Sequence, residues 1–301
     1  MTSAAISTTD LAKHYGDFVA LHGLNLQVQT GEIFGFLGPN GAGKSTAIKA
    51  LLDQVRPTAG RARILGLDAH RDSAAIRARI GYVPGDLALY PRLTGRQTLD
   101  YFAKLRGGVD QTYVTELSER FEADLSKKVG EYSTGNRQKI GLIQAFMHKP
   151  ELLILDEPNS GLDPLLQQVF HTLLNEVRDE GRTVFLSSHT LSEVERVADR
   201  VGIIRAGALI VVERIDALKL KAIRHVDFQF ATPIGAGLFE GVDAVREVHV
   251  DGHNARVTFE GDVNALLHTV VSAGEHVVSL TSRESDLEEI FLTYYRDDVD
   301  A

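Results

Sequence analysis

The sequence predicts an α/β fold that carries an inserted helical region and is followed by a small α+β domain. Short apolar runs alternate with helix-like patterns over the first two thirds of the chain, as is typical of a buried parallel sheet. Between residues 94 and 149 the strand pattern disappears and helical periodicity replaces it. Strand patterns return near the end of the chain. The expected domains are therefore residues 1–218, with a helical subdomain at about 94–149, and residues 219–301.

The strands expected in the first domain are short and apolar. Alternation at Leu24, Leu26 and Val28 predicts one strand, and a compact apolar run at 33–37 predicts a second, buried one. Further patterns of the same kind predict strands over 152–155, 183–186 and 201–204 and a helix over 166–177.

The helical region and the last domain have signals of their own. Thr94 and Gln97 form a capping-box pattern that predicts a helix start. In the last domain apolar and polar residues alternate again, and residues 251–254 have the composition of a turn. Its predicted elements are strands over 225–230, 245–250, 255–259 and 276–280 and helices over 263–271 and 287–294. This combination predicts a small α+β domain, and a ferredoxin-like arrangement is one that fits this order of elements.

Composition excludes several classes of function. The chain has 301 residues, a formal net charge of -9 and no cysteine, so disulfides and thiolate chemistry are excluded and nucleic acid is not an expected partner. No apolar run approaches the roughly 18 residues that a membrane span needs, and residues 1–15 lack the pattern of a secretion signal. We therefore expect a cytoplasmic protein.

A glycine-rich segment directly follows the expected strand at 33–37 and fits the pattern G-x-x-x-x-G-K-[ST]. The backbone amides of such a loop surround phosphates, Lys44 neutralises their β and γ oxygens, and Ser45 offers a hydroxyl to Mg²⁺. A chance glycine loop is the alternative, but the strand before it and the helix after it favour ATP binding. The expected ATP-binding residues here are Gly38, Pro39, Asn40, Gly41, Ala42, Gly43, Lys44, Ser45 and Thr46.

Two carboxylates follow the apolar run at 152–155. A buried strand would deliver Asp156 and Glu157 to the carboxyl edge of the sheet, beside the glycine-rich loop. Asp156 would hold Mg²⁺ through water, and Glu157 would polarise the attacking water as the catalytic base. Taken alone, the pattern fits a solvated turn better, and only the glycine-rich loop favours the catalytic interpretation.

The segment Tyr132-Ser133-Thr134-Gly135-Asn136 resembles the signature sequence of ABC ATPases, which usually reads Leu-Ser-Gly-Gly-Gln. Ser133 and Gly135 match that pattern, and the three departures resemble the branch of bacterial exporters similar to antibiotic-resistance pumps. Ser133 at a helix start and Gly135 without a side chain would both approach a γ-phosphate closely. An ordinary helix cap is the alternative interpretation of this segment.

Three more elements follow the order of that family. Tyr15 resembles the aromatic residue that stacks on adenine, Asp163 ends a segment that resembles the D-loop, and His189 resembles the switch histidine that contacts the γ-phosphate. Taken alone, Tyr15 or His189 fits a structural role better, and the order and spacing of the motifs favour the functional one. The resemblance covers residues 5–215 and implies a head-to-tail dimer of two copies that encloses ATP and Mg²⁺. It also implies a separate transmembrane permease, contacted near residues 90–98 from the cytoplasmic face, and export as the direction of transport.

One position departs from the family in a chemically important way. Gly85 stands where the family usually has a glutamine that contributes an oxygen to Mg²⁺, so water or Asp86 would have to replace it.

Two other functions fit parts of the sequence. A soluble ABC ATPase of DNA repair or ribosomes is disfavoured by the single P-loop and the acidic charge, and a regulator that does not hydrolyse ATP is disfavoured by Glu157 and His189. The last domain fits either a dimer-stabilising scaffold or a ligand sensor.

Overall fold

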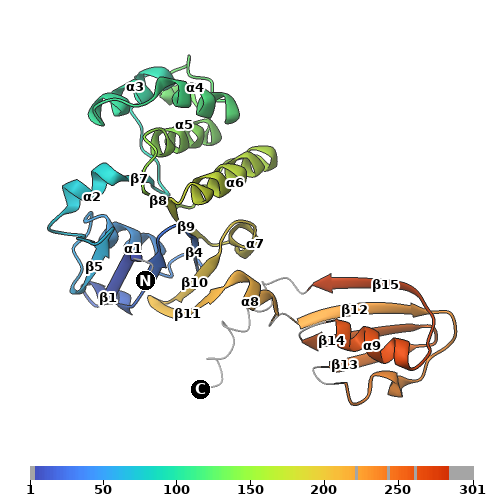
Figure 1. The fold of residues 1–301 in the computed structure, drawn as a ribbon. Helices are drawn as coiled ribbons and strands as arrows, with labels where there is room; N and C mark the ends of the chain where they lie inside the picture. Colours follow the sequence, from blue (N-terminus) through green and yellow to red (C-terminus); the bar gives the residue numbers. More distant parts are fainter. Residues whose placement is uncertain (1–3, 221–222, 243–244, 261–262, 285–301) are drawn as a thin grey trace. The chain divides into compact units, whose positions relative to one another are not determined.

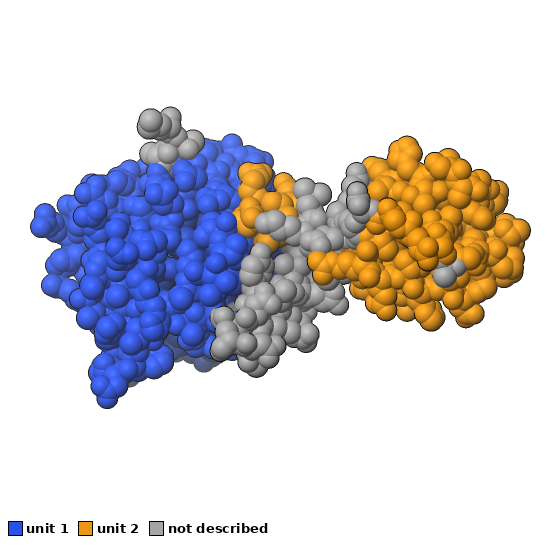
Figure 2. Space-filling view, turned by 90° about the horizontal axis from the view of Figure 1, so that it is seen from below, with its two compact units in different colours: residues 1–212 blue, residues 213–301 orange. Residues whose placement is uncertain are grey.

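The chain folds into two compact units, residues 1–212 and 213–301 (Figure 2). The structure is a computed structural model that describes residues 4–220, 223–242, 245–260 and 263–284. The division between the units falls slightly before residue 218, where the sequence predicts a domain boundary. Among the residues that the structure describes, no helix combines the length and the apolar character needed to span a membrane.

An antiparallel sheet opens the first unit. Its strands run in the order β2-β1-β5-β6, and β3 pairs with residues 4–7 at the beginning of β1. Their bounds are β1 Ala4–Tyr15, β2 Phe18–Leu24, β3 Gln27–Gln29, β5 Ala59–Ile64 and β6 Leu67–Asp68.

The single strand predicted from Leu24 to Val28 is wrong, because the structure divides it between β2 and β3. The side chain of Asn25 fills the break, accepting from the amide of Asp10 and donating to the Asp10 carboxylate. The two pieces pair with different parts of β1, so one straight strand cannot satisfy both ladders. Burial of the apolar side chains on either side of the break is nevertheless as expected.

The second sheet of this unit positions the site. Its strands run in the order β11-β10-β4-β9-β8-β7, and the five strands from β10 to β7 pair in parallel. Every residue of β4, β8 and β9 is buried, as expected of a sheet covered on both faces. The four predicted strands are confirmed as β4 Ile33–Leu37, β8 Leu152–Asp156, β9 Thr183–Ser188 and β10 Arg200–Arg205, and the sheet adds two that were not predicted, β7 Ile80–Val83 and β11 Ala208–Arg214.

Helices α3, α4 and α5 gather at one end of the first unit, away from the antiparallel sheet (Figure 1). The capping box predicted at Thr94 is present, because its hydroxyl accepts from the amide of Gln97 and the Gln97 side chain accepts in return. The helices of this unit are α1 Lys44–Leu51, α2 Ser73–Arg79, α3 Gly95–Leu105, α4 Gln111–Arg120, the short 3₁₀ helix η1 Val129–Glu131, α5 Thr134–Phe146, α6 Pro164–Asp179 and α7 Leu191–Glu195.

The second unit is an antiparallel sheet of order β13-β14-β12-β15 with α9 packed on one face. The four predicted strands and the 251–254 hairpin are confirmed, since Asp251 pairs with Asn254 across a two-residue turn. The helix predicted over 287–294 lies outside the described residues. The elements are α8 Ile215–Leu220, β12 Ile223–Phe230, η2 Ala236–Phe239, β13 Val245–Asp251, β14 Asn254–Glu260, α9 Asn264–Ser272 and β15 Val277–Glu284.

Candidate active site

The parallel sheet brings three distant segments to one edge. Leu37 at the end of β4 pairs with Ser188 at the end of β9, and Asp156 at the end of β8 pairs with Ser187. Because all three strands end at this edge, the residues that follow them emerge together: Gly38 after β4, Glu157 after β8 and His189 after β9. This register places the glycine-rich loop beside the two carboxylates, as the sequence predicts.

The glycine-rich loop between β4 and α1 needs glycine for two physical reasons. A Cβ on Gly38 would lie 2.4 Å from the carbonyl oxygen of Ile204, and one on Gly43 would lie 2.7 Å from the carbonyl oxygen of Ala20. Gly43 also has φ of 105°, which side chains disfavour. No side chain caps α1, so the amides at its start remain free to bind an anion.

Lys44 is buried at the start of α1, with 6% of its side chain exposed. Its Nζ donates to the carbonyl oxygen of Gly38 at 2.5 Å and to that of Pro39 at 3.3 Å. The same Nζ lies 3.3 Å from Oε1 of Glu157, close enough for an ion pair. The ammonium is therefore held over the loop, where it neutralises the carboxylate across the site.

Glu157 is held in a sparsely populated backbone conformation. Its φ is 50°, and its amide donates to both the carbonyl oxygen and the hydroxyl of Ser187, each at 3.2 Å. Oε2 lies 2.7 Å from Nδ1 of His189. Oε1 is buried and makes no hydrogen bond to the described residues, although Lys44 lies within ion-pair distance. The geometry aims one carboxylate oxygen at Lys44 and the other at His189.

Asp156 is buried, with 4% of its surface exposed. The hydroxyl of Ser187 donates to Oδ1 at 2.5 Å, and Oδ2 faces Gly85, where a Cβ would lie 3.3 Å away. Burial, together with the Asp156 charge, raises the pKa of the nearby Tyr82 to about 12, so that phenol stays protonated. One carboxylate oxygen is therefore positioned and the other lies beside the residue that lacks a side chain.

The residues present fit Mg²⁺. The Asp156 carboxylate and the hydroxyl of Ser45, which is exposed in the first turn of α1, are oxygen ligands of the kind Mg²⁺ prefers. Within the described part of the chain, no group of three or more His, Cys, Asp or Glu side chains could hold a metal alone. Mg²⁺ commonly binds one or two protein oxygens and completes its shell with phosphate and water. The exposed Asp86 follows Gly85, and its substitution at the metal stays a prediction.

The signature segment forms the start of α5. Ser133 caps this helix, its hydroxyl accepting from the amide of Asn136 at 3.2 Å, and the side chain lies exposed. Tyr132 is buried and its hydroxyl donates to the carbonyl of Asp124. Gly135 lies against Gly161, because a Cβ on Gly135 would be 2.3 Å from the Gly161 carbonyl oxygen. Packing against Gly161 of the same chain therefore already requires glycine at position 135.

Asp163 has a structural partner in the chain. Its carboxylate caps α6, accepting from the amides of Leu165 at 3.1 Å and Leu166 at 3.0 Å. Leu165, next to this cap, is 74% exposed. The role predicted for Asp163 in nucleotide binding stays a prediction, and the structure adds a helix-capping role.

Tyr15 ends β1 and is 47% exposed, with Nζ of Lys13 4.8 Å from the centre of its ring. It pairs with Phe18, the first residue of β2, which is 63% exposed. Strand β2 reaches the glycine-rich loop, since the carbonyl of Ala20 limits the space at Gly43. Phe18, three residues after Tyr15 in the same short hairpin, is therefore a second exposed aromatic residue on this side of the loop, and the role predicted for Tyr15 stays a prediction.

Ser187 is a positioning residue that the sequence does not single out. Its hydroxyl contacts the Asp156 carboxylate and the Glu157 amide, so one side chain positions both acids. Asn159, two residues after Glu157, is buried, and neither atom of its amide has a hydrogen-bond partner among the described residues. A serine at the end of an apolar strand beside His189 is a weak local signal, because only strand pairing reveals its partners.

Comparisons with known proteins identify relatives along nearly the whole chain. A family model described as ABC transporter matches residues 21–160. The bacitracin transport ATP-binding protein of Bacillus licheniformis is 35% identical over 96% of this chain and 97% of its own length. The daunorubicin resistance ATP-binding protein of Streptomyces coeruleorubidus is 34% identical over 99% of this chain and 98% of its own length.

Solved structures show the same fold in the first unit. An ATP-binding subunit of an ABC transporter is 30% identical, with a TM-score of 0.66 over 71% of this chain and 92% of that chain. A dimeric bacterial ABC transporter cassette is 23% identical, with a TM-score of 0.65 over 70% of this chain and 98% of that chain. The chain belongs to the ABC transporter family, as one of its ATP-binding and ATP-hydrolysing subunits.

Proposed function

We propose that Glu157 is the base that positions the attacking water and that His189 supports it at the γ-phosphate. The single observation that carries this proposal is the continuous contact from Lys44 through the Glu157 carboxylate to His189, beside the glycine-rich loop. Lys44 neutralises phosphate oxygens in this arrangement, and the free amides at the start of α1 bind the same phosphates. Tyr15 stacks on the adenine ring, with Phe18 beside it in the hairpin.

The hydroxyl of Ser45 and, through water, the carboxylate of Asp156 would hold Mg²⁺. When bound, the ion neutralises charge on the β- and γ-phosphate oxygens. Ser187 keeps the Asp156 carboxylate in place, since its hydroxyl donates to Oδ1. Because Gly85 carries no side chain, water or the neighbouring Asp86 would supply the oxygen that a glutamine at this position usually gives to Mg²⁺.

The active form is a head-to-tail dimer of two copies, in which Ser133 and Gly135 of one copy face the ATP bound by the other. Ser133 is exposed at the start of α5, and a helix start binds phosphate through its free amides. The dimeric cassette of the same fold supports this arrangement. The D-loop residue Asp163 takes part from the same interface while it caps α6.

A separate transmembrane permease is the second partner, and the chain works on the cytoplasmic face of the membrane as the motor of an exporter. The relatives named for bacitracin transport and daunorubicin resistance support this. An exposed aromatic pair fits the contact surface, since Tyr90 is 52% exposed, Tyr101 is 40% exposed and their ring centres lie 5.5 Å apart. Nucleic acid is not a partner of a chain this acidic.

Residues 94–149 form the helical subdomain and residues 219–301 the accessory domain. The strand order β13-β14-β12-β15 in the latter supports a ferredoxin-like arrangement, in which the short η2 replaces the first helix.

Affinity purification from detergent-solubilised membranes tests the partnership. A polytopic membrane protein should accompany the tagged chain and should be lost when Tyr90 and Tyr101 are both replaced by alanine. Val271→Ala, at an apolar residue of the second unit that is 74% exposed, serves as the control and should keep the partner. Recovery of the chain without any membrane protein would contradict the permease part of the proposal.

A further inference from the structure

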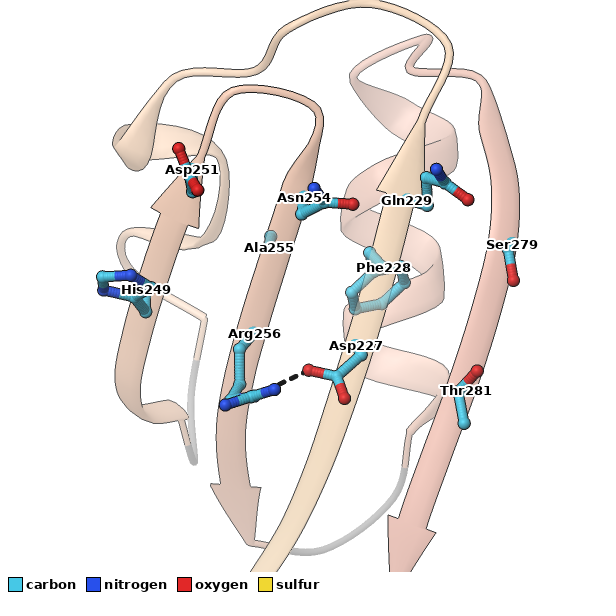
Figure 3. Close-up of a pocket in the computed structure, with 10 residues that line it drawn as sticks. All are labelled: Asp227, Phe228, Gln229, His249, Asp251, Asn254, Ala255, Arg256, Ser279 and Thr281. Atoms are coloured by element: carbon cyan, nitrogen blue, oxygen red, sulfur yellow. Dashed lines mark hydrogen bonds and ion pairs between the residues drawn. The ribbon is translucent and has the colours of Figure 1, made fainter.

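A hollow of about 410 Å³ lies on the sheet of the second unit, on the face turned away from α9 (Figure 3). Alternation along the strands separates the two faces, so that Val226 and Phe228 enter the core under α9 while Asp227 and Gln229 face the hollow. A volume of this size accommodates a small organic molecule. The hollow belongs to one unit only, and it does not depend on the function proposed for the other.

Two rows of polar side chains cross all four strands in this hollow, as the cross-strand register requires. The first row consists of Thr281, Asp227, Arg256 and His249. The second row consists of Ser279, Gln229, Asn254 and Asp251. Neighbouring rows lie two residues apart along each strand, which corresponds to about 7 Å.

The two rows differ in charge. In the first, Arg256 donates to the Asp227 carboxylate at 2.7 Å, so these charges neutralise each other. In the second, the exposed Asp251 carboxylate makes no hydrogen bond or ion pair with another described side chain. It stands next to the amide of Asn254, its cross-strand neighbour. The second row therefore carries an unbalanced negative charge together with amide acceptors.

We propose that this hollow binds a small ammonium compound with a carboxylate or hydroxyl a few ångströms from the nitrogen, the chemistry of a free amino acid. An ammonium group has three donors, which the Asp251 carboxylate and the amide oxygens of Asn254 and Gln229 accept. Arg256 and His249, one row away, supply donors for the second group. Hydrogen bonds of about 2.9 Å at both ends fit such a molecule between rows about 7 Å apart.

The lining disfavours flat aromatic ligands. Two residues that line the hollow carry rings, Phe228 and His249, and only 2% of Phe228 is exposed, so the small imidazole of His249 is the ring face that the lining offers to a nucleobase. The net charge of the lining is also negative when His249 is neutral, because Asp227 and Asp251 outnumber Arg256. This charge disfavours a ligand such as free phosphate, which brings negative charge without an ammonium group to pair with Asp251.

The test uses the full-length protein, ¹⁵N-labelled, with a mixture of the common L-amino acids as probe and their N-acetyl derivatives as the matched probe without an ammonium charge. Amide shifts on β12, β13 and β14 should saturate with the first probe and stay unchanged with the second. Asp251→Asn should weaken the response by about tenfold or more, as expected for loss of one charged hydrogen bond. Glu247→Gln removes an equal charge from the same face of β13 outside the hollow and should not weaken it.

Three results would overturn the proposal. The first is the absence of saturable shifts for every amino acid, and the second is an equal response in the Asp251→Asn protein. The third is a shift of the same amides on raising the protein concentration without probe, together with a doubled molar mass. This third result would identify the face as an interface between two copies of the chain.

Discussion

Gly135 and Gly161 touch through their backbones, since a Cβ on Gly135 would lie 2.3 Å from the Gly161 carbonyl oxygen and one on Gly161 would lie 3.2 Å from the Gly135 amide nitrogen. The first belongs to the signature segment at the start of α5, and the second precedes Asp163 on the segment that follows Glu157. The phosphate-facing segment of the proposed dimer therefore contacts the segment that follows Glu157, the proposed catalytic base.

Gly135→Ala should disturb the contact between the start of α5 and the segment that follows Glu157. The added methyl group must displace the Gly161 carbonyl, and a shift of about 1 Å near reacting groups can cost about a hundredfold in rate. We expect phosphate release to fall by about tenfold or more while ATP affinity at the P-loop is unchanged. Gly235→Ala, where a Cβ meets open space and φ is -86°, is the matched control. Parental turnover in the Gly135→Ala protein would show that the contact has no role in the reaction.

Glu157→Gln should stop hydrolysis without preventing binding. The amide keeps the shape of the side chain but loses the basicity, and a positioned base contributes about 10² to 10⁴ in rate. The trapped ATP should then hold two copies together in the presence of Mg²⁺, whereas ADP should not. Molar mass by light scattering and phosphate release check both effects.

A second substitution on this background tests the dimer geometry. Adding Ser133→Arg to Glu157→Gln places a bulky side chain on the exposed start of α5 and should abolish the ATP-dependent dimer while ATP still binds the P-loop. If the molar mass is indifferent to nucleotide in every variant, the sandwich arrangement is wrong; hydrolysis at the parental rate by Glu157→Gln would remove this carboxylate from the mechanism.

Tyr15→Ala should weaken ATP binding by about tenfold, because stacking on a base is worth roughly 1 to 3 kcal/mol. Tyr15→Phe keeps the ring and should be nearly neutral. The exposed neighbour Phe18 is the informative control: if Phe18→Ala is the weaker binder and Tyr15→Ala is neutral, the hairpin supplies its other aromatic residue to the adenine. Equilibrium titration with a fluorescent ATP analogue distinguishes these outcomes.

His148 makes the stability of the first unit depend on pH. Burial, helped by the nearby Arg106 charge, lowers its pKa from 6.5 to about 4. Between these values the unfolded chain binds a proton that the folded chain does not, so the free energy of unfolding should fall as pH falls from about 6.5 to 4.

His148→Gln should flatten this pH dependence, because glutamine can still donate to the carbonyl of Ile80 that His148 contacts at 3.0 Å but cannot titrate. His171, whose pKa is lowered by burial, titrates in both proteins and cancels in the comparison. Urea unfolding of the two proteins across the pH window measures the difference. Identical slopes would mean that His148 is protonated at its ordinary pH in the folded state.

Removal of residues 221–301 should leave a protein that binds ATP. Each of the proposed ATP-binding, metal-binding and catalytic residues lies before residue 190, and the second unit has a hydrophobic core of its own around Phe228 and Val257. Circular dichroism establishes that the shortened chain is folded before nucleotide is titrated. A folded protein without ATP affinity would contradict the expected division at residues 218 and 219.

The sequence alone determined the elements whose signals are local. The apolar runs at 33–37 and 152–155 predict buried strands, and the glycine pattern between Gly38 and Lys44, with a strand directly before it and a helix after it, predicts a tight phosphate-binding loop. Asp156 and Glu157 follow their strand directly, so their arrival at the sheet edge was predictable. The capping box at Thr94 was predictable for the same reason, since both partners lie within one helical turn.

Tertiary structure decided everything that depends on which strands become neighbours. Pairing of β9 between β4 and β8 puts Ser187 against Asp156 and His189 against Glu157, contacts that span about 30 residues of sequence. The break after Leu24 arises because two parts of β1 demand different partners. Glycine at Gly135 is required by a carbonyl that approaches from another segment. Such contacts depend on long-range packing, which local propensity does not encode, so they are visible only in the folded chain.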